Sequence, residues 1–317
     1  MVHFGIVGSG NSVIKSSEDR SVLATPDGLI GFEMEGSGMW DSLPCVIIKG
    51  PLKAMKAGPW HSQLYKNRNF VGRTELINDL TGKRFLGNNH AHQRIALSGL
   101  GGVGKTQLAL EIAFWVKDNM PGWSVFWIQA LSMASFEKSC REIAKLLSPN
   151  WVEQDDAREL VKKHLNSVAA GHWLFVVDNI DDETLSGRGE EGIRDFIPRS
   201  DRGQVLFTTR YRRIAHQLAQ NEIINLEQMN QDEAKELLSN SLVTKPPEDA
   251  EQTVFELLEF LTYLPLAIVQ AASYMNVTTA SVSQYIHLLR NTPGDMTKLL
   301  ETEWEDDSRD PKQTHAI

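Results

Sequence analysis

One short segment of the chain combines glycines with a lysine and a hydroxyl in a spacing that binds phosphate. Residues 99–106, GLGGVGKT, match the pattern G-x-x-x-x-G-K-[ST]. Glycines lack a Cβ, so successive backbone N–H groups of such a loop can point inward around a β-phosphate. We expect Lys105 to bridge the β- and γ-phosphates and the Thr106 hydroxyl to bind a magnesium ion.

The flanks of this segment favour the same interpretation. RIALS (94–98) is an apolar strand candidate and QLALEIAFWV (107–116) is good helix sequence, so the loop would lead into a helix N-terminus, which favours anions. The alternative is a glycine-rich turn with a chance lysine. The residues expected to touch a nucleotide here are Gly99, Gly101, Gly102, Val103, Gly104, Lys105, Thr106 and Gln107.

A magnesium ion at a phosphate loop needs a carboxylate, and an apolar run ending in aspartate supplies one. In WLFVVDNIDD (173–182), Asp178 closes a run typical of a central parallel strand. We expect Asp178 to bind the metal together with Thr106; the alternative is an aspartate that only ends the strand. Asn179 follows it and cannot take a proton from water, which predicts slow hydrolysis.

Another apolar strand candidate ends in an arginine. GQVLFTTR (203–210) is rich in β-formers, and open parallel sheets place ligand-binding groups at the carboxyl ends of their strands. There Arg210 would make a forked contact with the γ-phosphate and report which nucleotide is bound. The alternative is a solvated arginine in a basic cluster with Arg212 and Arg213. Together with Lys105 and Asp178, Arg210 is a candidate catalytic residue.

Strand and helix patterns alternate across the middle of the chain. SVFWIQ (124–129) predicts another strand, and residues 157–168 carry one apolar helical face. The alternation predicts a three-layer α/β domain with a mainly parallel sheet over residues 67–226. Over residues 227–290 only helical stripes follow, starting with a capping box at Asn230, and they predict a small helical domain.

Composition limits the partners and the location. The chain has 317 residues and a formal net charge of −9, which repels phosphate backbones and anionic membrane surfaces. We therefore expect no nucleic-acid and no membrane partner. No apolar run approaches the ~20 residues of a membrane span, and no signal-type segment opens the chain. Cys45 and Cys140 can form neither a disulfide framework nor a zinc site. These features predict a cytoplasmic protein.

Five motifs in a fixed order resemble the NB-ARC module of signal-transducing P-loop NTPases of the STAND class. That family includes NLR-type immune and incompatibility proteins of plants and fungi. The motifs are FVGR (70–73), the phosphate loop, VVDNIDD (176–182), FTTR (207–210) and LPLA (264–267). The resemblance implies a switch that binds ADP or ATP with Mg²⁺ and hydrolyses the nucleotide slowly or not at all.

The resemblance also implies roles for single residues. Val71 and Arg73 would lie near the adenine, Pro265 would pack on the base from the helical domain, and Arg210 would contact the terminal phosphate. The family's usual glycine before LPLA is Tyr263 here, so this turn departs from the pattern. The family implies self-association on activation, whereas we expect this chain to be a monomer.

The C-terminal segment, residues 291–317, departs from the family. Residues 301–310 carry six acidic residues and one arginine, which is typical of a solvated linker. The family's winged-helix domain would begin here, and its histidine, which holds the ADP β-phosphate, has no counterpart. The sequence therefore predicts an incomplete switch.

Residues 1–57 resemble the last third of the purine nucleoside and uridine phosphorylase family. Glu35 matches the residue that holds the ribose hydroxyls, but the family's general acid aligns with Lys53. We expect a truncated fragment without phosphorylase activity, followed by a linker over residues 58–66. The alternative function is a nucleoside-cleaving enzyme whose P-loop domain is regulatory.

Overall fold

The computed structural model describes the chain over a set of ranges with short gaps. These are residues 6–9, 29–33, 59–62, 65–82, 84–87, 92–148, 151–152, 155–189 and 192–291. The chain divides into two compact units, Met1–Lys56 and Ala57–Ile317.

The first unit contains a pair of parallel strands, β1 (Ile6–Ser9) and β2 (Leu29–Glu33). The other residues of the expected phosphorylase-like fragment, including Glu35 and Lys53, lie outside the described residues. The acidic segment 301–310 also lies outside them.

The second unit is built on a parallel sheet of six strands in the order β3-β5-β6-β7-β4-β8. Each neighbouring pair runs in parallel. The strands are β3 (Trp60–His61), β4 (Gln93–Ser98), β5 (Trp123–Gln129), β6 (His172–Asp178), β7 (Gly203–Thr209) and β8 (Ile223–Asn225). The order brings β4, which leads into the phosphate loop, next to β7, with β6 one strand further along.

Strand β3 lies inside the segment predicted to be a linker, residues 58–66. Trp60 and His61 pair with Val125 and Phe126 of β5, and the His61 ring is 3.1 Å from the Trp127 carbonyl oxygen. A strand of two residues has no periodicity to recognise, so the sequence pattern missed it. Part of the predicted linker therefore belongs to the edge of the sheet.

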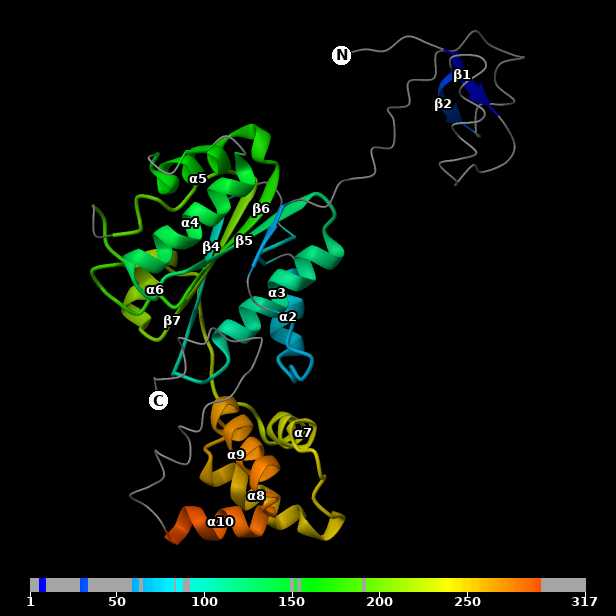
Figure 1. The fold of residues 1–317 in the computed structure, drawn as a ribbon, viewed down its shortest axis with the longest axis vertical. Coiled ribbons are helices and arrows are strands. Elements are labelled where there is room, and N and C mark those ends of the chain that lie inside the picture. The colour runs from blue at the N-terminus through cyan, green and yellow to red at the C-terminus, as the bar shows by residue number, and fades with distance from the viewer. Residues whose placement is uncertain are drawn as a thin grey trace. The chain divides into compact units, whose positions relative to one another are not determined.

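Helices cover both faces of the sheet, which gives three layers (Figure 1). On one face lie α2 (Thr74–Thr81) and α3 (Lys105–Asn119); on the other lie α4 (Met133–Leu147), α5 (Ala157–Asn166) and α6 (Arg212–Ala219). The helix predicted over residues 157–168 ends at Asn166, and a 3₁₀ turn, η1 (Val168–Ala170), follows it. The predicted three-layer α/β architecture is confirmed.

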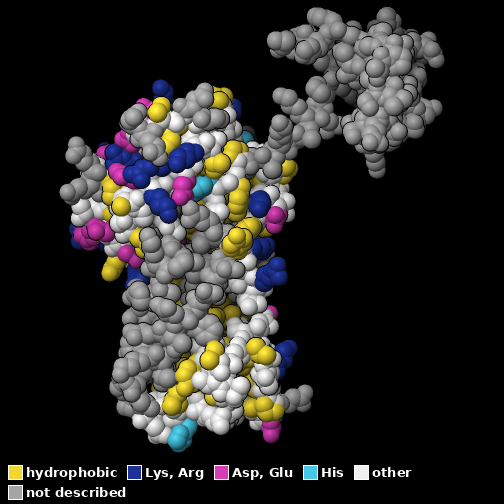
Figure 2. All heavy atoms as spheres, in the orientation of Figure 1, with side chains coloured by type: hydrophobic (Ala, Val, Ile, Leu, Met, Phe, Trp, Pro, Cys, Tyr) yellow, Lys and Arg dark blue, Asp and Glu magenta, His cyan; other side chains and the backbone are white. Residues whose placement is uncertain are grey.

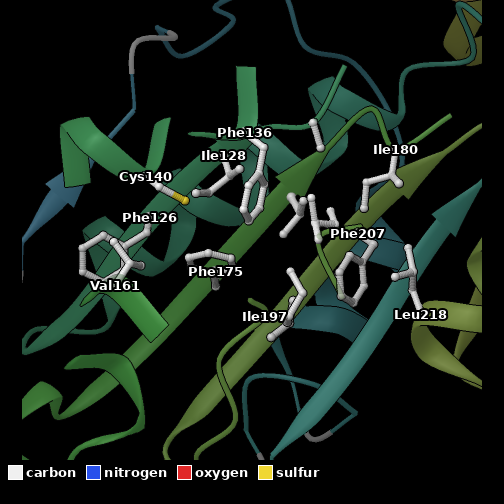
Figure 3. Packing of buried hydrophobic residues seen from close by; sticks show 14 of the residues in the cluster. Phe126, Ile128, Phe136, Cys140, Val161, Phe175, Ile180, Ile197, Phe207 and Leu218 are labelled. Carbon is white, nitrogen blue, oxygen red and sulfur yellow. The ribbon is translucent and has the colours of Figure 1, made fainter. Parts of the chain in front are cut away.

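The core between the sheet and helices α4, α5 and α6 is rich in aromatic rings (Figure 3). Phe126, Phe175 and Phe207 come from three adjacent strands and pack with Phe136 and Cys140 of α4. Burial raises the pKa of the Cys140 thiol. This cysteine is therefore a core group.

Residues 230–291, here called the helical lobe, fold into helices alone. They are α7 (Gln231–Ser241), the short η2 (Glu248–Ala250), α8 (Glu251–Phe260), α9 (Pro265–Thr278) and α10 (Val282–Asn291). The predicted capping box is present, because the Asn230 side chain accepts from the Glu233 N–H at 2.9 Å and the Glu233 carboxylate accepts from the Asn230 N–H at 3.1 Å. Pro265 stands in the first turn of α9, where its missing N–H costs nothing. No helix within the described ranges has the length and apolarity to cross a membrane.

We expect Gly203→Ala to destabilise the fold. A Cβ at Gly203 would lie 2.0 Å from Cζ2 of Trp173, and the Trp173 indole is buried and donates to the Leu165 carbonyl at 2.9 Å. Overpacking of this kind lowers the free energy of unfolding by about 1–3 kcal/mol. Chemical denaturation monitored by circular dichroism measures the change.

The matched test is the same substitution in a Trp173→Phe background. The smaller ring leaves room for the new methyl group, so Gly203→Ala should cost clearly less there. An equal cost in both backgrounds would contradict the steric explanation.

Candidate nucleotide-binding site

The phosphate loop connects the end of β4 to the first residue of α3. Gly102 and Gly104 have φ angles of 76° and 98°, in the left-handed region that favours glycine. Gly104 is the N-cap of α3, and a Cβ placed there would meet no atom within 4 Å. The loop therefore turns into a helix N-terminus through backbone that only glycine adopts easily, as the motif predicts.

The Lys105 ammonium lies inside this loop. Lys105 is only 6% exposed, and its Nζ donates to the carbonyl oxygens of Gly99 and Leu100, both at 2.8 Å. Burial lowers the pKa of Lys105 to about 8; the negative charge of Asp181 opposes this change and the positive charge of Arg210 adds to it. An ammonium in this position can bind the oxygens of a phosphate that enters the loop.

Asp178 gathers hydroxyl groups from two other elements. Its Oδ1 accepts from the Thr106 hydroxyl at 2.9 Å and from the Thr208 hydroxyl at 2.6 Å, and the aspartate is 1% exposed. The structure thus brings Thr106 and Asp178 together, as expected from the sequence. A hydroxyl and a carboxylate are oxygen donors of the kind that Mg²⁺ prefers.

Asn179 binds the other oxygen of the same carboxylate. Its φ angle is 62°, its side-chain amide donates to Asp178 Oδ2 at 3.2 Å, and its backbone N–H donates to the Thr208 hydroxyl at 2.8 Å. Thr208 was not assigned a role from the sequence, although FTTR placed it at a strand end. The structure shows that Thr208 orients Asp178 and the turn that follows it.

Arg210 pairs with an aspartate, Asp181, and the sequence did not predict this pairing. Asp181 accepts from the Arg210 backbone N–H at 2.7 Å and lies 3.0 Å from the guanidinium Nε. The arginine side chain is 39% exposed. Its charge acts on Lys105, so Arg210 belongs to the electrostatic surroundings of the loop. Its contact with a γ-phosphate stays a prediction.

The helical lobe touches the phosphate loop directly. The backbone N–H of Leu266, in the first turn of α9, donates to the Gly102 carbonyl at 3.2 Å. Leu264 packs against the core beneath α3 and against the core of the helical lobe. Pro265 lies between these two residues and is half-buried. The loop and the proline expected to cover a base are therefore neighbours.

The turn before α9 contains two non-glycine residues with the positive φ angles that glycine usually adopts. Tyr263 and Thr262 have φ angles of 53° and 51°. The Tyr263 carbonyl accepts from the Met229 N–H at 3.2 Å, which ties this turn to the start of the helical lobe. Tyr263, which stands where the family's glycine is expected, thus adopts left-handed backbone that is strained for a non-glycine residue.

The FVGR segment is attached to the helical lobe as well. Val71 is 4% exposed and packs in the core of that lobe. The Arg73 backbone N–H donates to Glu233 Oε1 at 2.8 Å, and the Arg73 guanidinium donates to the Glu227 carbonyl. Val71 and Arg73 thus lie at the junction between the helical lobe and the sheet with its covering helices, which together are the two lobes, and their contact with adenine stays a prediction.

The remaining expected contact residues belong to the loop and the first turn of α3. Val103 is 2% exposed and packs in the core beneath α3. The Gln107 side-chain oxygen accepts from the Asn67 amide at 2.8 Å, which attaches the segment before FVGR to the helix. Within the described ranges, no group of three or more His, Cys, Asp or Glu side chains could hold a metal ion. A metal at Thr106 and Asp178 would therefore need further oxygens from its ligand or from water.

Comparisons with known proteins agree with this geometry. The chain is 30% identical to a nucleotide-binding leucine-rich repeat (NLR)-like protein of Hyaloscypha variabilis, over 96% of this chain and 36% of that protein. It is 26% identical to the disease resistance RPP13-like protein 4 of Arabidopsis thaliana, over 49% of this chain and 18% of that protein. The chain thus spans about a third or less of the length of these relatives. They do not show the phosphorylase-like resemblance of residues 1–57, which stays a prediction.

The fold has solved counterparts. A Walker-type ATPase of Pyrococcus abyssi superposes with a TM-score of 0.50 at 16% identity, over 78% of each chain. At this identity the likeness concerns the fold alone. The model of the NB-ARC domain matches residues 74–248, which is more than half of the chain. The protein with this phosphate loop and helical lobe therefore belongs to the NB-ARC domain family.

Proposed function

We propose that this chain is a switch that binds ADP or ATP with Mg²⁺ and changes the packing of its helical lobe with the nucleotide bound. The hydrogen bond between Leu266 and Gly102 carries the proposal, because it puts the helical lobe on the loop that would hold the phosphates. A ligand that reshapes the loop must then act on the lobe.

The described residues fit a magnesium nucleotide. Lys105 would bind the β- and γ-phosphates, and Thr106 and Asp178 would hold the ion, which neutralises phosphate charge when bound. Val71, Arg73 and Pro265 lie around the junction of the lobes, where the adenine would be covered.

The side chains beyond Asp178 support slow hydrolysis. Asn179 carries no base, and its amide is used on Asp178. Asp181 is paired with Arg210. Neither residue is placed to take a proton from water, so we infer a slow or absent NTPase activity and not a motor. The NLR-like and disease resistance relatives support a role in NLR-type immune or incompatibility signalling. We place this role in the cytoplasm and propose that this chain itself is a monomer.

The first test is the binding of Mg·ADP. A ligand at a thousandfold excess over its Kd stabilises the folded state by about 4 kcal/mol, so the melting temperature of the purified chain should rise by several degrees. Lys105→Ala should remove the rise, because the phosphates lose their ammonium partner. Differential scanning fluorimetry measures the shift, and chromatography after denaturation identifies any nucleotide that purified with the protein.

Lys138→Ala is the matched control. Lys138 is an exposed lysine of α4, 3.9 Å from Glu142, and its loss removes the same charge from the same domain. The control should keep the full rise. No rise for the wild type, or the same rise for Lys105→Ala, would reject nucleotide binding at the loop.

Arg210→Ala should weaken ATP more than ADP. A hydrogen bond to a charged group contributes about 1.5–3 kcal/mol, so the affinity for a non-hydrolysable ATP analogue should fall by about 10-fold or more while the ADP affinity changes little. Isothermal titration calorimetry with Mg²⁺ measures both ligands. Arg213→Ala is the control, since Arg213 is 74% exposed and pairs with the exposed Glu183. Equal losses for both nucleotides would show that Arg210 does not recognise the γ-phosphate.

A further inference from the structure

A basic hollow lies at the opposite end of the sheet from the phosphate loop. Its lining comes from α5 and from the segment that connects β6 to β7, and it has a volume of about 250 Å³. The charged and polar residues that line it are Lys162, Asn166, Arg188, Arg194, Asp195 and Arg199. The Arg199 backbone N–H donates to Asn166 at 2.6 Å, which joins the connecting segment to the end of α5. We define these residues as the basic pocket.

The basic pocket contains more positive charge than its neighbours neutralise. In the part of the chain that the structure describes, no carboxylate lies within ion-pair distance of Arg188, Arg194 or Arg199. Lys162 has an exposed partner, Glu159, at 3.4 Å. Asp195 accepts from the Gly189 backbone N–H at 3.1 Å. Glu190 and Glu191 lie outside the described residues.

Two guanidinium groups in this region keep buried N–H donors that have no hydrogen-bond partner among the described residues. They are Nε of Arg194, in the basic pocket, and Nη2 of Arg94, at the start of β4. A buried donor that makes no hydrogen bond costs free energy, and a charged one costs more. An oxyanion that accepts from such groups would recover that cost.

Arg94 lies in the electrostatic field of two arginines of the basic pocket, Arg199 and Arg194. Burial, together with the positive charges of Arg199 and Arg194, lowers the pKa of Arg94 to about 10. Arg94 Nε donates to His92 Nε2 at 3.2 Å, and the other ring nitrogen is 2.8 Å from the Gly203 carbonyl, so His92 is neutral. Burial accordingly lowers the pKa of His92. The histidine relays hydrogen bonds and adds no counter-charge.

We propose that the basic pocket binds a small phosphate-type oxyanion, such as phosphate or diphosphate, independently of the nucleotide site. Planar guanidinium groups match the oxygens of a phosphate in a forked geometry. The whole chain has a formal charge of −9, so this basic cluster is a local exception. Figure 2 shows Lys and Arg side chains, with Asp and Glu side chains among them, on the face over α4 and α5. The small volume favours a compact anion over a polymer such as RNA.

Titration calorimetry with sodium diphosphate tests the proposal on the full chain. The experiment uses Lys105→Ala protein with EDTA at constant ionic strength, so that the phosphate loop does not contribute. We expect saturable binding of one diphosphate per chain. The double variant Arg188→Ala/Arg199→Ala should weaken it at least 10-fold; both residues are exposed, so the variant should fold.

The double variant Arg212→Ala/Arg213→Ala is the matched control. It removes the same charge from exposed positions of α6 at the other end of the sheet and should leave the diphosphate affinity within twofold. In the wild-type background, Arg188→Ala/Arg199→Ala should leave Mg·ADP binding unchanged, which separates this proposal from the proposed nucleotide switch.

Three results would overturn the proposal. One is the absence of saturable diphosphate binding. Another is an equal loss in the control variant, which would indicate a general charge effect. The third is tighter binding of a single-stranded oligonucleotide than of diphosphate through the same arginines, which would assign the pocket to nucleic acid.

Discussion

The hydrogen bond from the Leu266 N–H to the Gly102 carbonyl is the constraint on which the arrangement of the two lobes depends. The first N–H groups of a helix have no partner inside the helix, and α9 satisfies this one with the backbone of the phosphate loop at 3.2 Å. The loop can come this near because Gly102 has no side chain; a Cβ there would lie 2.8 Å from the Leu266 Cβ. Glycine in this loop therefore serves the approach of a helix as well as the approach of a phosphate.

A carboxylate joins the lobes at a second point. Glu233 accepts from the Arg73 N–H with one oxygen and from the Asn230 N–H with the other. A movement of the helical lobe as a body would take Glu233 with it and leave the Arg73 N–H to find another acceptor, which costs about 1–3 kcal/mol where water cannot reach it. The two junctions are thus a backbone contact near the phosphates and a side-chain contact near the FVGR turn. A nucleotide that spans both positions would act on both junctions at once.

Local features of the fold and the site could be predicted from the sequence, whereas contacts between distant segments could not. The phosphate loop, the strand that ends at Asp178 and the capping box at Asn230 follow from residue types at short spacing. The pairing of Asp181 with Arg210 and of Glu233 with Arg73 joins residues 29 and 160 positions apart. Such pairs depend on strand order and on the docking of the helical lobe, which periodicity does not encode. The edge strand at residues 60–61 was missed for the opposite reason, because it is too short to show a pattern.

The two ends of the sheet differ in whether their cations are paired with described carboxylates. At the carboxyl end, the cations face carboxylates of the same chain: Arg210 pairs with Asp181, and Lys105 lies in the field of Asp181 and Asp178. Such a site is balanced before a ligand arrives, so a nucleotide and its metal must exchange one set of contacts for another. At the amino end, described carboxylates do not pair with the arginines of the basic pocket, and a buried guanidinium donor at Arg194 has no acceptor among the described residues. An anion that binds there displaces no internal ion pair of the described residues. Its affinity would therefore depend steeply on ionic strength, whereas that of a balanced site depends on it less.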